Sequence, residues 1–187
     1  MLPSSRRPLG SAVEIAALAV GGLFAIHLLR FLLRIPAGPF GIVPRQVRGL
    51  QGILFAPLLH ANWEHVFANA LPLFIFLILL LADRHYYPYR TLGLVWFASG
   101  AGTWLIGREH SVHIGASGVI FGLAAYLILA GFMMRRWQAA LVTVILLVLF
   151  GGMFYGVIPQ AGPISWEGHL SGALAGAWAA RRNHGGA

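Results

Sequence analysis

The sequence contains no cysteine and no lysine, and acidic residues are scarce. The absence of cysteine excludes a disulfide framework, a thiolate nucleophile and a thiolate metal site. All thirteen basic residues are arginines, and only five acidic residues oppose them, so the net charge is +8. These arginines are dispersed as singles and pairs between apolar runs. This pattern is typical of topology markers in a membrane protein and does not favour a nucleic-acid partner.

Charged residues of either sign are also few. They make up 10% of the 187 residues, whereas a soluble domain carries about 25%. Hydrophobic residues account for 58% of the chain, and the mean hydropathy is +0.77. Such a chain has too few polar groups to cover a water-exposed surface, so lipid must solvate much of it. No small-residue cleavage site follows the first apolar stretch, which we therefore interpret as a retained span.

Six segments are candidates for helices that cross a bilayer, which requires about 20 residues each. The sequence thus predicts an all-α polytopic membrane protein, a six-transmembrane-helix bundle. We expect residues 1–187 to form a single membrane domain with short tails at about 1–10 and 182–187. The third and sixth segments are short and rich in small residues, which favours burial inside the bundle. The predicted spans are Ser11–Leu33, Asn62–Ala82, Arg90–Ile106, Ala116–Met134, Ala139–Val157 and Gly168–Ala180.

The placement of the arginines predicts a cytoplasmic N-terminus. With six spans, both termini share one side with the second-to-third and fourth-to-fifth connections. The first connection on the opposite side, residues 35–59, is long and apolar enough to lie in the membrane interface. The N-terminal side holds Arg6, Arg7, Arg84, Arg90, Arg135, Arg136, Arg181 and Arg182, and the other side holds Arg30, Arg34, Arg45, Arg48 and Arg108.

Polar residues gather at the starts of the second, fourth and sixth predicted spans. These three spans run in the same direction, so His65, Asn69, Ser117 and His169 are expected at similar depth below one membrane face. Polar groups at such positions are costly and indicate function. A hydroxyl, an imidazole and N–H donors at helix starts are the components of an acyl-transfer site.

Spacing within the second span predicts a local arrangement. His65 and Asn69 are four residues apart, so they share a helix face and point to one site. Asn62 is a suitable N-cap, which leaves His60 in the preceding loop. We expect His60 to brace that loop by hydrogen bonding.

Small residues in the fourth and sixth spans predict close packing between the two helices. Gly118 and Gly122 are four apart, and Gly168, Gly172 and Gly176 repeat the same spacing. Small residues at this interval let helix backbones approach one another. Such an approach would bring the serine of the fourth span within hydrogen-bond reach of the histidine of the sixth.

Two neighbours of this pair are also interpretable. Phe121 lies one turn after Ser117, where its ring could stack on His169 and fix its orientation. Glu167 lies two residues before His169, and helical residues two apart point to different faces. We therefore interpret Glu167 as an interfacial charge and not as the acid of a catalytic triad.

Taken together, these motifs resemble the rhomboid family of intramembrane serine proteases, over about Gly52–Gly176. The motifs occur in the same order and on the corresponding spans. The resemblance implies a rhomboid-like six-helix bundle whose site opens to water from the extracytoplasmic side. Its motifs are His60, His65 and Asn69, then Gly115-Ala116-Ser117-Gly118, then His169 followed by Gly172.

By this resemblance, Ser117 would be the nucleophile and His169 the general base, without a carboxylate partner. His65, Asn69 and the Ser117 N–H would form the oxyanion hole. The resemblance further implies an integral protein of a prokaryotic cell membrane, the inner one where there are two. It implies peptide-bond cleavage in single-pass or polytopic membrane proteins within the lipid bilayer, with no cofactor, metal or nucleic acid. Supporting positions would be His60, Gly115, Gly118, Phe121 and Gly172.

Two other functions remain open. A non-catalytic relative could use the same fold to bind client helices, although loss of the serine or histidine would be its signature. A histidine-based metalloprotease is the second alternative, but His60, Glu64 and His65 do not fit the spacing H-x-x-E-H. His110 and His113 supply only two metal ligands in one loop. The roles of these two histidines and of His27 are not readable from the sequence, nor are the substrate, the oligomeric state or the organism.

Overall fold

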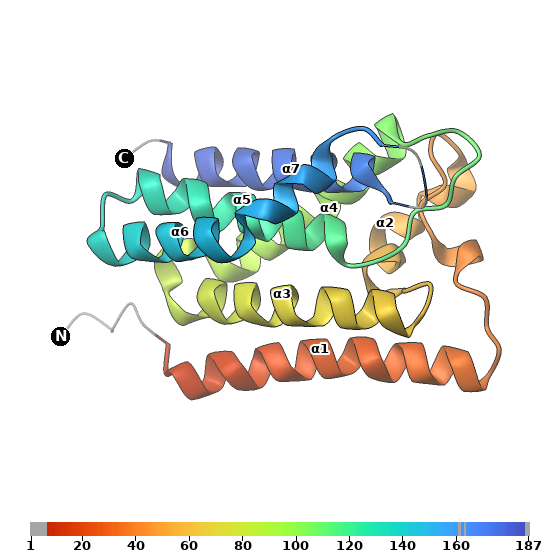
Figure 1. The fold of residues 1–187 in the computed structure, drawn as a ribbon, viewed down its shortest axis with the longest axis horizontal. Coiled ribbons are helices and arrows are strands. Elements are labelled where there is room, and N and C mark those ends of the chain that lie inside the picture. Colours follow the sequence, from red (N-terminus) through yellow and green to blue (C-terminus); the bar gives the residue numbers. More distant parts are fainter. Residues whose placement is uncertain (1–6, 161, 163, 186–187) are drawn as a thin grey trace.

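The computed structural model describes residues 7–160, 162 and 164–185, and it is all-helical over those residues. The described residues form no strand, only one isolated antiparallel bridge between Ile42 and His113. The all-α prediction is therefore confirmed. Arg6 and parts of the predicted tails lie outside the described residues. The α-helices (Figure 1) are α1 Leu9–Leu32, α2 Gly52–Phe55, α3 Trp63–Ala82, α4 Pro88–Ile106, α5 Ser117–Met133, α6 Trp137–Phe150 and α7 Trp166–His184.

Each predicted span corresponds to one long helix, but several boundaries were wrong. The last helix extends well beyond the predicted Gly168–Ala180 at both ends. The fifth begins earlier, at Trp137, and changes at Gly151 to a 3₁₀ helix, η5, Gly151–Val157. By length and hydropathy, three helices could cross a membrane: α1, α3 and α6 continued through η5. Helix α5 is apolar but shorter, so composition alone does not establish six spans.

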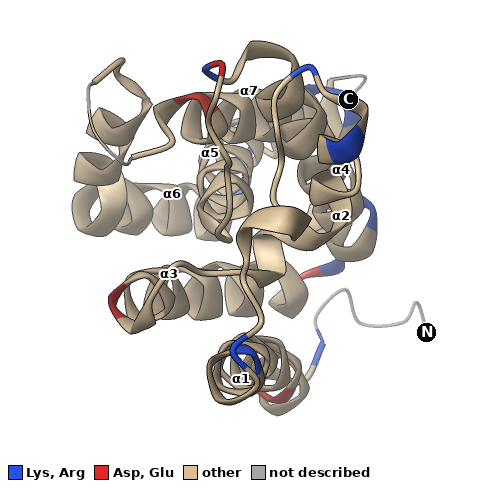
Figure 2. Cartoon of the chain, turned by 90° about the vertical axis from the view of Figure 1, so that its right-hand side faces the viewer, with Lys and Arg blue, Asp and Glu red and all other residues tan. Residues whose placement is uncertain are grey.

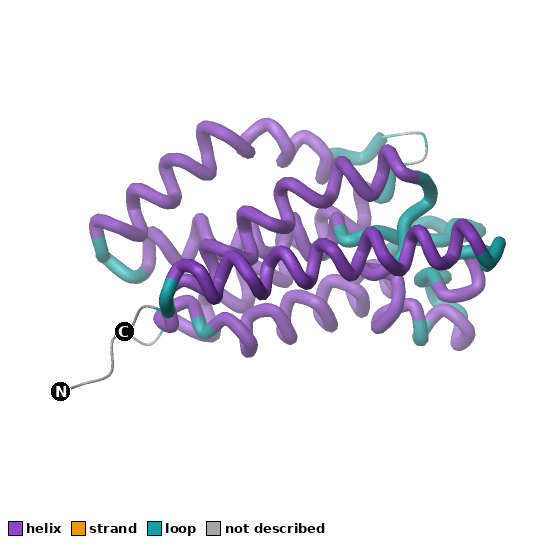
Figure 3. The backbone as a smooth tube through the Cα atoms, turned by 90° about the horizontal axis from the view of Figure 1, so that it is seen from below, coloured by secondary structure: helices purple, strands orange, loops and turns teal. Residues whose placement is uncertain are grey.

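Helix α5 is the centre of the molecule. Between Val119 and Gly131 nearly every side chain is buried, as expected of a helix that is apolar on all sides. Helices α3, α4, α6 and α7 surround it, and α7 makes the most extensive contact with it. Helix α1 packs mainly against α3 at the edge of the bundle (Figures 1 and 3), and most of its surface is exposed. Exposed apolar faces of this kind suit lipid.

Glycines allow α5 and α7 to touch through their backbones, as the spacing predicted. A methyl group on Gly172 would overlap the carbonyl oxygen of Gly118, and one on Gly176 would overlap that of Gly122. At Gly172 and Gly176, α7 could not carry a larger residue without moving away from α5. The start of α5 and the start of α7 are thereby held side by side.

The connection between α1 and α3 is folded. It contains α2 and three short 3₁₀ helices: η1 Gly38–Phe40, η2 Val47–Gly49 and η3 Ala56–Leu58. Gly52 packs on the backbone of Gly41, and Ile42 pairs with His113 of the α4–α5 loop. Helix α2 contacts α4. The connection therefore forms a wall beside the starts of α3 and α5.

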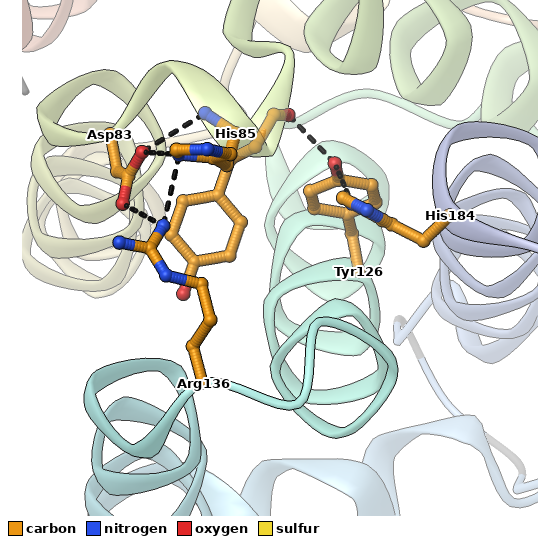
Figure 4. A network of polar contacts seen from close by, with 6 residues as sticks. Asp83, His85, Tyr126, Arg136 and His184 are labelled. Carbon is orange, nitrogen blue, oxygen red and sulfur yellow. Dashed lines mark hydrogen bonds and ion pairs between the residues drawn. The ribbon is translucent and has the colours of Figure 1, made fainter. Parts of the chain in front are cut away.

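Charged residues lie mostly at helix ends and in loops, as the blue and red segments of Figure 2 show. The end that carries both described termini has its own polar network, which includes the 3₁₀ helix η4, Arg84–Tyr86. Arg136 donates to Asp83 over 3.1 Å, and the Tyr126 hydroxyl donates to the Tyr86 carbonyl over 2.7 Å and lies 3.2 Å from His184 (Figure 4). These contacts join α3, α5, α6 and α7 at the end opposite the candidate site.

Candidate active site

Ser117 is the first residue of α5, where the N–H groups of the first turn lack helical partners. The turn before it needs Gly115, whose φ of +118° is unfavourable for residues with a side chain. Two contacts hold this turn. The Gly115 N–H donates to the carbonyl of Ala56 over 2.9 Å, and the Ala116 N–H points to Nε2 of His60 at 3.4 Å. Ser117 is therefore presented at a helix N-terminus by a braced loop.

His60 is the brace on the α3 side of this loop. It is fully buried, and Arg30 donates to its carbonyl over 3.2 Å. Burial, together with the nearby His65, lowers the pKa of His60 to about 3. The ring is thus neutral, with Nε2 unprotonated to accept from the Ala116 N–H. His60 lies in the loop and performs the bracing that its position predicted.

His65 and Asn69 project from the first two turns of α3. Asn62 caps this helix as predicted, since its Oδ1 accepts from the His65 N–H over 2.8 Å. The His65 ring lies against Gly115, where even a methyl group would come within 2.6 Å of Nε2. Asn69 is buried and donates one amide hydrogen to the His65 carbonyl over 2.7 Å. Its second amide hydrogen remains for another acceptor.

His169 is held from two sides. Its ring stacks on Phe121, with centroids 4.1 Å apart and planes inclined by 7°. Its Nδ1 lies 3.0 Å from the carbonyl of Gly156. Because a carbonyl can only accept, Nδ1 must carry the proton, which leaves Nε2 as the basic nitrogen. No hydrogen bond joins His169 to Ser117 in this structure, so the close contact of α5 and α7 does not by itself complete the predicted pair.

Glu167 differs from its prediction as an interfacial charge. It is fully buried, and its Oε1 lies 2.6 Å from Nε of Arg108 and accepts from the Arg108 N–H over 3.2 Å. Arg108 also donates to the carbonyls of Gly162 and Ile164. The burial of Glu167 is explained by Arg108, which lies 59 residues away in the sequence. The spacing between Glu167 and His169 does not reveal such a distant partner. Glu167 makes no hydrogen bond to His169.

His113 connects the same two loops. Its Nε2 lies 2.8 Å from the hydroxyl of Ser111, and its Nδ1 contacts the hydroxyl of Ser165 just before α7. Burial lowers its pKa, and Arg108 adds to this effect while Glu167 opposes it. The α4–α5 loop is therefore fixed to the start of α7 by an ion pair and by a histidine. No sequence pattern predicted the contact of His113 with Ser165.

Two cavities adjoin these residues. A cavity of about 30 Å³ lies beside Ser117 and is bordered by Ser99, Thr103 and His113. This is enough room for a water molecule. An outer cavity of about 480 Å³ borders His65 and Arg108. His113, Ile114 and Ser165 line both. Among the described residues, no group of three His, Asp or Glu side chains could hold a metal ion.

Comparison with known proteins decides the family. The Rhomboid domain matches residues 47–184, which covers most of the chain and includes His60, His65, Asn69, Ser117 and His169. The chain belongs to the rhomboid family. With its apolar helices, it is an integral membrane protein of that family.

Most of the similar proteins bear the name uncharacterised protein. A protein of Mycobacterium tuberculosis is 43% identical over 149 residues, which cover 75% of this chain and 62% of that protein. A protein of Mycobacterium leprae is 39% identical over 168 residues, 84% of this chain and 66% of its own length. Rhomboid-like protein 11, chloroplastic, of Arabidopsis thaliana is 29% identical over 162 residues, 70% and 56% of the two chains. The match thus spans about three fifths of the length of the mycobacterial relatives.

Proposed function

We propose that this rhomboid-family chain is an intramembrane serine endopeptidase in which Ser117 is the nucleophile and His169 the general base. The observation that carries the proposal is the state of His169. Its Nδ1 donates to the Gly156 carbonyl and its ring is stacked on Phe121. The basic Nε2 is therefore fixed on the helix that packs most closely against the one beginning at Ser117.

The proposed reaction proceeds in two steps. The Ser117 hydroxyl attacks the scissile carbonyl carbon while its proton passes to Nε2 of His169, which then protonates the leaving amine. Water, deprotonated by the same nitrogen, hydrolyses the acyl-enzyme and restores the hydroxyl. The Gly156 carbonyl takes the orienting role that a carboxylate has in a triad. The imidazolium that forms is thus stabilised by a neutral acceptor.

Negative charge develops on the substrate carbonyl oxygen in both steps. We assign its stabilisation to the Ser117 N–H, the His65 ring and the second amide hydrogen of Asn69. The first is an unpaired N–H at the positive end of the α5 dipole. The His65 ring lies against the turn that precedes Ser117. Donors that are in place before the reaction are the largest source of rate in many enzymes.

We further propose that α1, α3, α4, α5, α6 and α7 are the six spans, with a cytoplasmic N-terminus. Helices α4 and α7 are less apolar than the other proposed spans, and they pack against each other and against α5. The substrates would be single-pass or polytopic membrane proteins that approach through the bilayer. With the N-terminus in the cytoplasm, the candidate site lies at the extracytoplasmic end of the bundle.

The test is cleavage of a transmembrane reporter together with labelling by a fluorophosphonate probe mapped by mass spectrometry. Ser117→Ala and His169→Ala should abolish cleavage, and the probe should modify Ser117 in the wild type alone. Ser171→Ala is the matched control. Ser171 lies on α7, as His169 does, and its hydroxyl has no hydrogen-bond partner in the described part of the chain. Near-normal cleavage by either site variant would refute the assignment.

Two further outcomes would favour the alternatives. A wild-type protein that folds and binds helices but neither cleaves nor labels would be a non-catalytic member that holds client helices. Inhibition by EDTA or phenanthroline, reversed by zinc, would indicate metal chemistry in place of the serine. We expect chelators to leave the activity unchanged.

A further inference from the structure

A separate cavity lies between the end of α1 and the start of α3, at the same end of the bundle as the candidate active site. Its volume is about 420 Å³, within the range of about 300–1,000 Å³ that is usual for small-molecule sites. It is lined by His27, Arg30, Phe31, Arg34 and Trp63, among others, and by no acidic residue. The proposed catalytic residues do not border it.

The charge of this cavity is uncompensated. Within the described residues, neither Arg30 nor Arg34 forms an ion pair; the arginines that do are Arg45, Arg108 and Arg136. Arg30 is half-buried, so its charge is only partly solvated. A charge in such a position is unfavourable without a counter-charge. The cavity therefore favours an anion.

Within the described part of the chain, Arg30, which lines the cavity, also has an unpaired donor. Its two terminal nitrogens donate to the carbonyls of His60 and Ile35 over 3.2 and 3.1 Å. Its Nε is buried and has no partner among the described residues, and the same holds for Nδ1 of His27. An arginine Nε–H is always a donor, so an anion oxygen would satisfy a group that the protein leaves unpaired.

The surroundings indicate a lipid anion. Phe31 and Leu32, at the last turn of α1, are 64% and 66% exposed, and Phe31 lines the cavity. The preceding turns of α1 also carry exposed apolar side chains, and Trp63 lines the cavity with its ring edge-on to that of His27, centroids 4.6 Å apart. Tryptophan and arginine next to an apolar belt are typical of the headgroup level of a bilayer.

We propose that this cavity binds the phosphate of an anionic phospholipid through Arg30 and Arg34, with its acyl chains along the exposed face of α1. Guanidinium groups match phosphate oxygens in geometry and charge. The site adjoins the loop that presents Ser117, because Arg30 donates to the carbonyl of the buried His60. Lipid binding itself does not depend on proteolytic activity.

The experiment measures lipid binding to the purified full chain in neutral detergent. Phosphatidylglycerol, phosphatidylcholine and inorganic phosphate are titrated separately, and binding is followed by native mass spectrometry. Phosphatidylglycerol should bind more tightly than phosphatidylcholine. An arginine near a membrane surface contributes about 1 kcal/mol to binding anionic lipid, so Arg34→Gln should weaken phosphatidylglycerol binding about fivefold. Arg30→Gln should do so by at least as much.

Arg48→Gln is the matched control. Arg48 lies at the same end and is exposed, and Gln46, outside the cavity, is its one side-chain hydrogen-bond partner among the described residues. The Arg48→Gln substitution should leave phosphatidylglycerol affinity unchanged. A loss of affinity equal to that of Arg34→Gln would show unspecific electrostatic attraction and overturn the proposal. Equal affinity for phosphatidylcholine would overturn it as well. If inorganic phosphate saturated the site at the same concentration as phosphatidylglycerol, the ligand would be a free anion and not a lipid.

Discussion

At the scale of the residue, His60 links the protonation state of one ring to the shape of the candidate site. The native ring is neutral, and its pKa of about 3 lies below the ordinary value of 6.5. Between these values the unfolded chain binds a proton that the native chain does not. Stability therefore rises with pH in this window, and it falls as the pH is lowered from 6.5 toward 3. Protonation would also turn Nε2 into a donor facing the Ala116 N–H.

We expect thermal unfolding of the wild type to show a decline in stability below pH 6.5. His60 can contribute up to about 1.4 kcal/mol per pH unit. His60→Gln should be less stable at pH 7 but should lose less on acidification, because the amide oxygen can accept from Ala116 without titrating. Parallel curves for the two proteins between pH 4 and 7 would show that His60 is not the group responsible.

Asn69 and His65 should act on the transition state more than on the bound substrate. Removing one donor from an oxyanion hole costs about 10²–10³ in kcat. Asn69→Ala and His65→Ala should accordingly lower kcat strongly and leave KM nearly constant, as measured with a reporter peptide in detergent. The second donor and the Ser117 N–H limit the loss in each variant. An Asn69→Ala protein changed only in KM would make this residue a substrate contact.

At the scale of the element, the contact between α5 and α7 sets the geometry. Gly172→Ala would drive a methyl group into the Gly118 carbonyl, and overpacking of this kind costs about 1–3 kcal/mol. We expect a lower unfolding temperature and slower probe labelling of Ser117, because α7 moves away. Gly93→Ala in α4 is the control, since a methyl group there meets nothing within 4 Å. A loss of similar size in both variants would mean that helix contact is not the cause.

The Arg108–Glu167 pair should matter more than its exposed neighbour. Arg108→Met leaves a fully buried carboxylate unpaired, which costs about 3–5 kcal/mol, whereas Glu109→Ala breaks a surface pair worth about 0–1 kcal/mol. Denaturation in detergent compares the two. The double variant Arg108→Met, Glu167→Leu should recover part of the loss. If the double variant recovered no stability, the loss would come from the hydrogen bonds between Arg108 and the loop carbonyls and not from the unpaired carboxylate.

The sequence predicted what depends on local spacing. The cap by Asn62, the stacking of Phe121 on His169 and the glycine contacts all arise from residues at fixed helical intervals. Glu167 was wrongly predicted to be an interfacial charge, because its partner Arg108 belongs to a distant loop. The acceptor for Nδ1 of His169 could not be predicted either, because it is a backbone carbonyl in η5. Main-chain acceptors carry no residue identity, so only the fold reveals them.

At the scale of the whole molecule, the two ends differ in character. Both described termini and the connections after α3 and α5 lie at one end (Figure 1), together with seven described arginines. The candidate site and the cavity beside α1 lie at the other. Hydropathy marks only three of the described helices as spans, because α5 is shorter and α4 and α7 contain many small and polar residues. The expected orientation is therefore inferred from the distribution of the arginines and not from hydropathy.

Because the chain has no cysteine, single cysteines provide a direct measurement of this orientation. Val47 lies at the active-site end and Tyr89 at the other, and both are exposed. Neither substitution alters the number of arginines that set the topology. With a cytoplasmic N-terminus, Val47→Cys should react with a membrane-impermeant maleimide in intact cells, whereas Tyr89→Cys should react only after permeabilisation. The reverse pattern would place the site in the cytoplasm, and labelling of both positions in intact cells would contradict a chain that crosses the membrane between them.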